Sequence, residues 1–199
     1  MIKRLLDFGL AALGLFILFP LLLIIAAWVL LDSPGPVFFR HERIGRRFQP
    51  FLVVKFRTMT WDPRKNRDDF HPCPGSMVTR AGTFLRAWKL DELPQLWNVL
   101  KGEMSLVGPR PEVGKYVFMF KKENEEILSV RPGLTGPGSL KYRNEEELLA
   151  RAKDPEREYV KTILPDKIRM AKEYVRGRSL IGDLWILGRT AMTVLGRGR

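Results

Sequence analysis

Residues 8–31 read FGLAALGLFILFPLLLIIAAWVLL and carry no charged side chain. About 20 helical residues suffice to cross the hydrocarbon core of a bilayer, so this run is long enough to form a membrane helix. Basic residues flank it on both sides, and Pro20 lies near its middle. A proline inside a helix removes one backbone hydrogen bond and kinks the helix. The run therefore predicts a kinked membrane helix over residues 1–32.

Three interpretations of this helix compete. A cleaved signal peptide would begin with basic residues such as Lys3 and Arg4, but its apolar stretch is shorter and ends at a small-residue cleavage site that this sequence lacks. A spanning helix normally has its basic residues on the cytoplasmic side, whereas here they stand on both sides. This distribution and Pro20 favour a re-entrant, monotopic helix whose ends share one side of the membrane. Prolines also occur in ordinary membrane helices, so the spanning form stays open.

Residues 33–199 predict one α+β domain that is mainly helical. Two extended runs stand on either side of Gly45–Arg47, which predicts a β-hairpin over residues 36–59. Stretches rich in proline, glycine or aspartate predict loops. These loops are Trp61–Ser76, residues 105–114 (SLVGPRPEVG) and residues 131–139 (RPGLTGPGS).

Helical periodicity marks the other segments. They are Thr79–Lys101, which Gly102 should end, then Lys115–Leu128, Asn144–Val175 and the amphipathic residues 179–199. Trp88, Trp97 and Trp185 could anchor amphipathic helices at the membrane interface, or they could fill a core. The sequence alone leaves both uses of these tryptophans open.

The composition excludes several classes of protein. The chain has 199 residues, with 34 Lys+Arg against 22 Asp+Glu, and its net charge of +12 favours polyanionic partners. One cysteine excludes an intrachain disulfide framework. Neither the dinucleotide-binding nor the P-loop glycine fingerprint is present, and no hydrolase triad has a signature. His41, His71 and Cys73 are interpreted as structural or incidental, since they lack partners for a metal site.

Asp91 and Glu92 stand directly before Leu93–Gln95, at the start of a predicted helix. Acidic residues and proline are favoured in a first helical turn, so the pair could simply cap the helix. A helix N-terminus also binds phosphate and keeps carboxylates ionised. An ionised aspartate can attack phosphorus as a nucleophile, which makes the pair a candidate catalytic site.

Basic residues cluster in the sequence around this acidic pair. Arg110 lies between Pro109 and Pro111, so its backbone has little freedom. One arginine guanidinium can bind two phosphate oxygens at once, so an arginine on a rigid backbone is a good phosphate ligand. Each basic residue could instead be a solvated surface charge. The candidates for phosphate binding are Lys55, Arg57, Arg86, Arg110 and Arg131.

At the level of whole motifs, the chain resembles a known family almost from end to end. The motifs are SPGPVFFRHERIG (33–45), KFRTM (55–59), RPGLTG (131–136), DLWILGRT (183–190) and, most specific of all, TRAGTFLRAWKLDELPQLWNVLKGEMSLVGPRPE (79–112). They resemble those of the monotopic phosphoglycosyl transferases, the bacterial sugar transferase family. ILPDKIRMAKEYV (163–175) is similar to the short subgroup, which includes the bacillosamine-type phosphotransferases.

The resemblance implies a reaction and roles for the candidate residues. Asp91 would attack a UDP-sugar, release UMP and hold the phosphosugar covalently, and polyprenyl (undecaprenyl) phosphate would then take it by a ping-pong route. Glu92 would assist the acceptor as a base, and Mg²⁺ would bind at Asp91. Arg86 and Arg110 match family positions expected to contact phosphate or to keep the site in shape. The weaker candidates are Lys55, Arg57 and Arg131.

The resemblance also implies a location on the cytoplasmic face of the bacterial inner membrane. Membrane lipid and downstream glycosyltransferases would be partners, and nucleic acid would not. RPGLTGPGS departs from the usual pattern after its second glycine, which leaves the sugar open. Two alternatives remain: a non-catalytic, membrane-anchored basic protein that binds anionic lipid or polymer, and a family member in which Asp91 only binds Mg²⁺ and transfer is direct.

Overall fold

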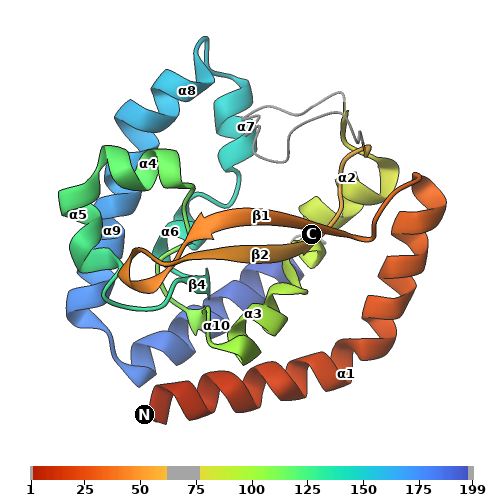
Figure 1. The fold of residues 1–199 in the computed structure, drawn as a ribbon, viewed down its shortest axis with the longest axis horizontal. Coiled ribbons are helices and arrows are strands. Elements are labelled where there is room, and N and C mark those ends of the chain that lie inside the picture. The colour runs from red at the N-terminus through yellow and green to blue at the C-terminus, as the bar shows by residue number, and fades with distance from the viewer. Residues whose placement is uncertain (1, 62–76, 197–199) are drawn as a thin grey trace.

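The computed structural model describes residues 2–61 and 77–196. The predicted loop Trp61–Ser76 falls, after its first residue, outside the described part of the chain, as do His71 and Cys73. The described residues are mainly helical and include two small two-stranded sheets, which confirms the predicted class. Figure 1 shows the helices arranged around the longer sheet.

The first helix, α1 (Ile2–Asp32), contains Pro20 and exposes most of its large apolar side chains. Among the described residues it is the one helix long and apolar enough to cross a membrane, judged by length and composition alone. It bends near its middle, running beneath the other elements and then up beside them (Figure 1). A proline in a helix interior explains such a bend.

Both ends of α1 are bonded to the rest of the chain. Near its start, Lys3, Arg4 and Asp7 bond to the ends of other elements; their partners are the carbonyls of Val99, Leu100 and Val107, the side chains of Ser105 and Asp183, and the amide of Leu106. At its end, Asp32 Oδ2 accepts a hydrogen bond from Ala81 N at 2.9 Å. The helix is therefore fastened to the same body of structure at both ends.

The predicted β-hairpin is confirmed. Strands β1 (Phe38–Ile44) and β2 (Pro50–Phe56) pair antiparallel, with Phe38 opposite Phe56 and Ile44 opposite Pro50. The short 3₁₀ turn η1 (Arg46–Phe48) joins them. Arg47 and Phe48 have φ values of 58° and 60°, so the turn uses the left-handed region without glycine at either position.

The predicted helix Thr79–Lys101 is interrupted. It consists of α2 (Arg80–Ala87), the 3₁₀ turn η3 (Leu90–Glu92) and α3 (Gln95–Lys101). Lys89, with φ of 55°, turns the chain between α2 and η3. Gly102, with φ of 85°, ends α3 as predicted, because glycine adopts this conformation without strain.

Both predicted glycine-proline loops contain a strand, which corrects the sequence prediction. β3 (Ser105–Val107) pairs in parallel with β4 (Gly133–Thr135), and α6 (Pro137–Lys141) follows. Three-residue strands are too short to display an alternating pattern. The pairing needs glycine, because a Cβ on Gly133 would lie 2.1 Å from the backbone N of Gly108.

The later segments are helical as predicted, but two of the predicted helices are divided into shorter ones. Residues 115–128 form α4 (Gly114–Met119) and α5 (Lys121–Ile127), which meet at Phe120. Residues 144–175 form α7 (Glu145–Ala150), α8 (Pro155–Glu158), the π-helical turn η4 (Tyr159–Ile163) and α9 (Leu164–Gly177), and α10 (Leu180–Leu195) follows.

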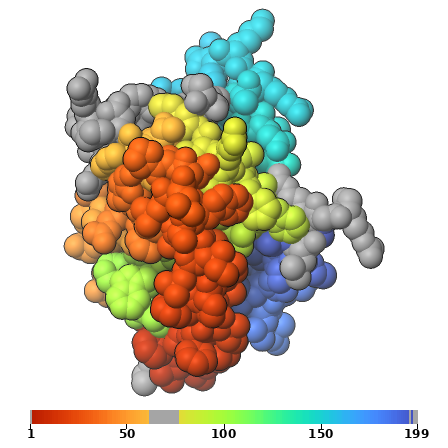
Figure 2. Space-filling model, turned by 90° about the vertical axis from the view of Figure 1, so that its right-hand side faces the viewer, coloured from red at the N-terminus to blue at the C-terminus, as the bar shows by residue number. Residues whose placement is uncertain are grey.

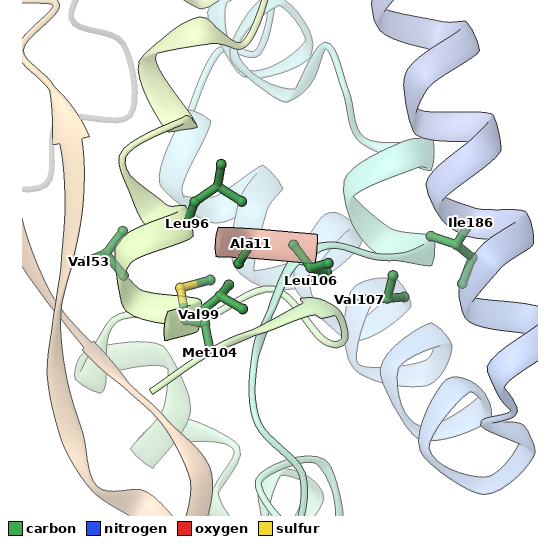
Figure 3. Packing of buried hydrophobic residues seen from close by; sticks show 8 residues of the cluster. All are labelled: Ala11, Val53, Leu96, Val99, Met104, Leu106, Val107 and Ile186. Atoms are coloured by element: carbon green, nitrogen blue, oxygen red, sulfur yellow. The ribbon is translucent and has the colours of Figure 1, made fainter. Parts of the chain in front are cut away.

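A buried cluster joins α1 to the other elements. Ala11 of α1 packs with side chains from β2, α3, β3 and α10, as Figure 3 shows. In contrast, Trp97 and Trp185 are 52% and 59% exposed and do not fill a core. The apolar side chains Ile181, Leu184 and Met192 of α10 are exposed as well. These exposed groups suit helices that lie at a membrane interface.

Candidate active site

Asp91 and Glu92 lie in η3, directly before α3, as the sequence predicted. Both are buried, although carboxylates rarely are unless they are paired. The left-handed turn at Lys89 brings the chain back sharply after α2 and so places the two acids between α2 and α3. Neither η3 nor α3 has a side-chain cap hydrogen bond, and their N-cap residues are Lys89 and Pro94, which argues against the simple capping interpretation.

Glu92 is held by two cations. Lys55 Nζ lies 2.8 Å from its Oε1, and Arg110 contacts the same oxygen at 2.6 Å. Burial alone would raise the pKa of Glu92, but the charges of Arg110 and Lys55 outweigh it and hold that pKa well below its usual value. The Glu92 charge in turn raises the pKa of Arg110. Glu92 is therefore an ionised carboxylate whose charge is already neutralised.

Asp91 is in the opposite situation. Its Oδ1 is buried and has no hydrogen-bond partner within the described part of the chain. Burial raises the pKa of Asp91, the charge of Glu92 adds to this effect, and the cations Lys55, Lys89 and Arg86 oppose it. Buried polar atoms are nearly always hydrogen-bonded, so an unpartnered carboxylate oxygen points to a ligand or a reaction.

Contacts of Glu112 hold the loop that carries Arg110 in place. Ile44 N donates to the carbonyl oxygen of Glu112 at 3.0 Å, and Arg43 pairs with the Glu112 side chain, also at 3.0 Å. The hydroxyl of Tyr159 donates to the other carboxylate oxygen of Glu112. Burial raises the pKa of Tyr159 above its usual value, so this hydroxyl keeps its proton. These bonds hold Arg110 rigidly toward Glu92.

Arg86 lies at the edge of the site. Its Nε donates to Thr58 Oγ1 at 2.9 Å, and its guanidinium pairs with Glu146 at 3.0 Å. The Glu146 side chain is 64% exposed, so a phosphorylated ligand could compete with it for Arg86. The structure thus brings together five of the predicted residues, namely Asp91, Glu92, Lys55, Arg86 and Arg110.

Arg57 and Arg131 have other partners. The buried Arg57 guanidinium donates to the carbonyl oxygens of Val29, Ser33 and Pro34, at the end of α1. Arg131 Nε donates to the carbonyl oxygen of Gly102 at 2.6 Å. Both side chains thus bind backbone carbonyl groups, and within the described part of the chain no hydrogen bond or ion pair joins either of them to the acidic pair. Phosphate binding by these two arginines finds no support in the geometry.

Sequence reasoning missed several residues of the site. Thr58 and Glu146 orient Arg86, and Glu112 with Tyr159 secures the Arg110 loop. Tyr159 and Glu146 lie far from Asp91 and Glu92 in the sequence, so no local sequence pattern could place them in the site. Glu112 could have been noticed in the sequence, because it is a charged residue that directly follows Arg110-Pro111 in a rigid loop.

A magnesium ion fits the site only together with a substrate. Among residues 2–61 and 77–196, no group of three or more His, Cys, Asp or Glu could hold a metal ion. Mg²⁺ needs only one or two carboxylates when substrate phosphates supply further oxygens. Asp91 has the unpartnered oxygen for this, whereas Glu92 is occupied by Lys55 and Arg110.

The fold and the site together define a class of protein. A long apolar helix is packed against a body of structure that holds a buried carboxylate among several cations. Lysine and arginine side chains can bind phosphate oxygens, and a carboxylate with a perturbed pKa is typical of catalytic sites. These features are typical of a membrane-associated enzyme that acts on phosphorylated substrates.

Comparison with known proteins identifies the family. Residues 1–197 match the family model described as bacterial sugar transferase. The chain therefore belongs to the bacterial sugar transferase family, which confirms the resemblance seen in its motifs. It is a transferase.

Three relatives illustrate the range of the family. A Bacillus subtilis (strain 168) protein, named as a candidate undecaprenyl-phosphate N-acetylgalactosaminyl 1-phosphate transferase, is 40% identical over 73% of this chain and 79% of its own length. A UDP-glucose:undecaprenyl-phosphate glucose-1-phosphate transferase of Xanthomonas campestris pv. campestris is 37% identical over 98% of this chain but 39% of its own length. The exopolysaccharide production protein ExoY of Sinorhizobium fredii (strain NBRC 101917 / NGR234) is 34% identical over 98% of this chain and 87% of its own length.

Proposed function

We propose that this protein transfers a phosphosugar from a UDP-sugar to undecaprenyl phosphate, giving undecaprenyl diphosphate sugar and UMP. The names of the relatives support the acceptor and the class of donor. The observation that carries the proposal is the pairing of two unlike carboxylates: Asp91 has an unpartnered buried oxygen, while Glu92 beside it is neutralised by Lys55 and Arg110.

In the first half-reaction, an Asp91 carboxylate oxygen attacks the phosphorus next to the sugar. A bond from Asp91 to phosphorus forms, the bond from that phosphorus to the bridging oxygen breaks, and UMP leaves with the electron pair. Lys55, Arg86 and Arg110 surround the site where charge develops, and preorganised cations stabilise such a transition state. In the second half-reaction, an acceptor phosphate oxygen attacks the same phosphorus and frees Asp91.

Glu92 acts in this mechanism as a positioning residue. A base needs a free oxygen and a pKa near the working pH, whereas the Glu92 carboxylate is bonded to two cations and has a strongly lowered pKa. An acceptor phosphate is already ionised at neutral pH and needs no base. We therefore assign Glu92 the task of holding Lys55 and Arg110 in place for the donor phosphates.

Mg²⁺ would be held by Asp91 and the donor diphosphate. When bound, it would neutralise phosphate charge and help the leaving group depart. The unpartnered Asp91 Oδ1 would be the metal ligand, which would leave the other carboxylate oxygen of Asp91 for the attack on phosphorus.

We further propose that α1 is re-entrant and that the site faces the cytoplasm. Lys3, Arg4 and Asp7 at the start of α1 bond to the same body of structure as Asp32 at its end. A spanning helix would separate its ends by the bilayer, about 30 Å thick, and could not make both sets of bonds. The bend at Pro20 supports the same topology.

The test incubates the purified chain with Mg²⁺, undecaprenyl phosphate and a panel that includes UDP-N-acetylgalactosamine and UDP-glucose, the donors named for the relatives. UMP release from one donor, lost in Asp91→Asn and after chelation, is expected. Without acceptor, wild type should release up to one UMP per chain and gain the mass of the phosphosugar. UMP that forms only when acceptor is present, with no mass gain, would argue for direct transfer.

A further inference from the structure

A groove of about 440 Å³ lies between α1, the hairpin and α3, and neither Asp91 nor Glu92 lines it. Leu15 and Leu22 of α1 line one side, Leu52 and Val54 of β2 another, and Trp97 of α3 a third. Figure 2 looks onto the face of the molecule along which α1 runs. The volume falls within the range of small-molecule sites, and most of the lining is apolar.

The groove is separate from the candidate active site. Successive side chains of a strand point to opposite faces. Val54 and Phe56 line the groove, whereas Lys55 between them reaches Glu92. Strand β2 therefore stands between the groove and the acidic pair, and a molecule bound in the groove need not take part in the reaction.

Two cations that line the groove lack hydrogen-bond and ion-pair partners in the part of the chain that the structure describes. Arg40 and Lys101 form no hydrogen bond or ion pair with any described residue and are exposed. One acid, Glu103, also lines the groove, and its Oε2 accepts a hydrogen bond from Asn98 Nδ2 at 2.7 Å. The charged lining thus has a net charge of +1, which suits a ligand with one negative charge.

We propose that this groove binds an anionic bilayer phospholipid, with an acyl chain along the apolar lining and the phosphate against Arg40 and Lys101. On α1, the neighbouring Phe16, Phe19 and Leu23 are 80%, 58% and 55% exposed, so the groove opens beside a surface suited to lipid tails. A polar metabolite would leave the apolar lining unsatisfied, and a purely apolar one would bury the cations at a cost. The proposal rests on the membrane placement of α1, not on the transfer chemistry.

The experiment titrates the detergent-purified full chain with phosphatidylglycerol or phosphatidylcholine of identical acyl chains and counts bound lipid by native mass spectrometry. Two basic side chains near an anionic headgroup should favour phosphatidylglycerol roughly 10- to 30-fold. Arg40→Ala with Lys101→Ala should abolish the preference. Lys121→Ala with Lys122→Ala, which removes the same charge from exposed positions on α5, should retain it.

A second variant tests the apolar half of the site. Leu52 is 49% exposed, so Leu52→Trp can fold and fill the groove, and it should weaken binding of both lipids. Equal affinity for the two lipids, or a preference that survives loss of Arg40 and Lys101, would overturn the proposal. Displacement of phosphatidylglycerol by undecaprenyl phosphate, one for one, would assign the groove to the acceptor instead. UMP release, measured separately, reports on the transferase proposal alone.

Discussion

Replacing Glu92 with glutamine separates a positioning role from a base. The amide keeps the shape of the side chain and removes the charge that Lys55 and Arg110 contact at 2.8 and 2.6 Å. Charge-assisted hydrogen bonds contribute about 1.5–3 kcal/mol each. Because the side chains of Lys55 and Arg110 are 25% and 36% exposed, solvent relieves part of the loss, and we expect the free energy of unfolding to fall by about 2–3 kcal/mol.

The catalytic effect should appear in both half-reactions. Without the Glu92 charge, Lys55 and Arg110 shift and the donor phosphates bind out of position. A displacement of about 1 Å can lower the rate by about 10²-fold. We therefore expect Glu92→Gln to lower kcat/KM by about that factor for UMP release without acceptor and for complete transfer alike. Glu125→Gln, the same change at an exposed position on α5, should alter neither stability nor rate. Normal UMP release with loss of transfer alone would refute this reasoning and restore Glu92 as a base for the acceptor.

Three further predictions follow from the same contacts. Because burial raises the pKa of Asp91, activity should fall as the pH drops through that raised pKa. Asp91→Asn should be inactive, yet more stable than wild type at neutral pH, because it removes a buried charge. This gain in stability should vanish below the ordinary aspartate pKa, and thermal unfolding at several pH values would check it. Glu146→Gln should lower the KM for the donor several-fold by releasing Arg86, and an unchanged KM would count against donor contact by Arg86. Asp7→Asn should weaken two hydrogen bonds at the start of α1 and cost about 1–3 kcal/mol in unfolding measurements, whereas an unchanged midpoint would contradict that anchoring role.

Parts of the fold governed by local chemistry could be predicted from the sequence. The apolar run, the hairpin around Gly45–Arg47 and the stop at Gly102 each follow from residues close together in the chain. The pairing of β3 with β4 could not be predicted, since it joins two short proline-flanked segments by backbone contact at Gly108 and Gly133. Such a pairing depends on tertiary approach, which no local pattern reports.

The candidate site shows the same division. The sequence identified Asp91, Glu92 and three of the cations near them, Lys55, Arg86 and Arg110, but not Lys89. The local sequence could not separate Arg110 from Arg131, because both stand in rigid proline-containing loops, and only the family resemblance ranked Arg110 higher. Only the fold shows that Arg110 reaches Glu92 and that Arg131 bonds to a backbone carbonyl instead. A residue type and its flanking prolines thus indicate that the backbone is stiff, but they do not indicate which group the side chain contacts.

Adjacent carboxylates with opposite surroundings provide the strongest argument for the proposed roles. Asp91 and Glu92 differ by one methylene, and both are buried. Burial raises the pKa of Asp91, while the cations bonded to Glu92 hold its pKa far below normal. Environments that drive two like groups apart assign them different tasks. Lys55 and Arg110 are committed to Glu92, and donor phosphates that approach them would lie beside Asp91, the carboxylate with an unpartnered oxygen. The same charges would then hold the substrate while leaving the proposed nucleophile, Asp91, free to react.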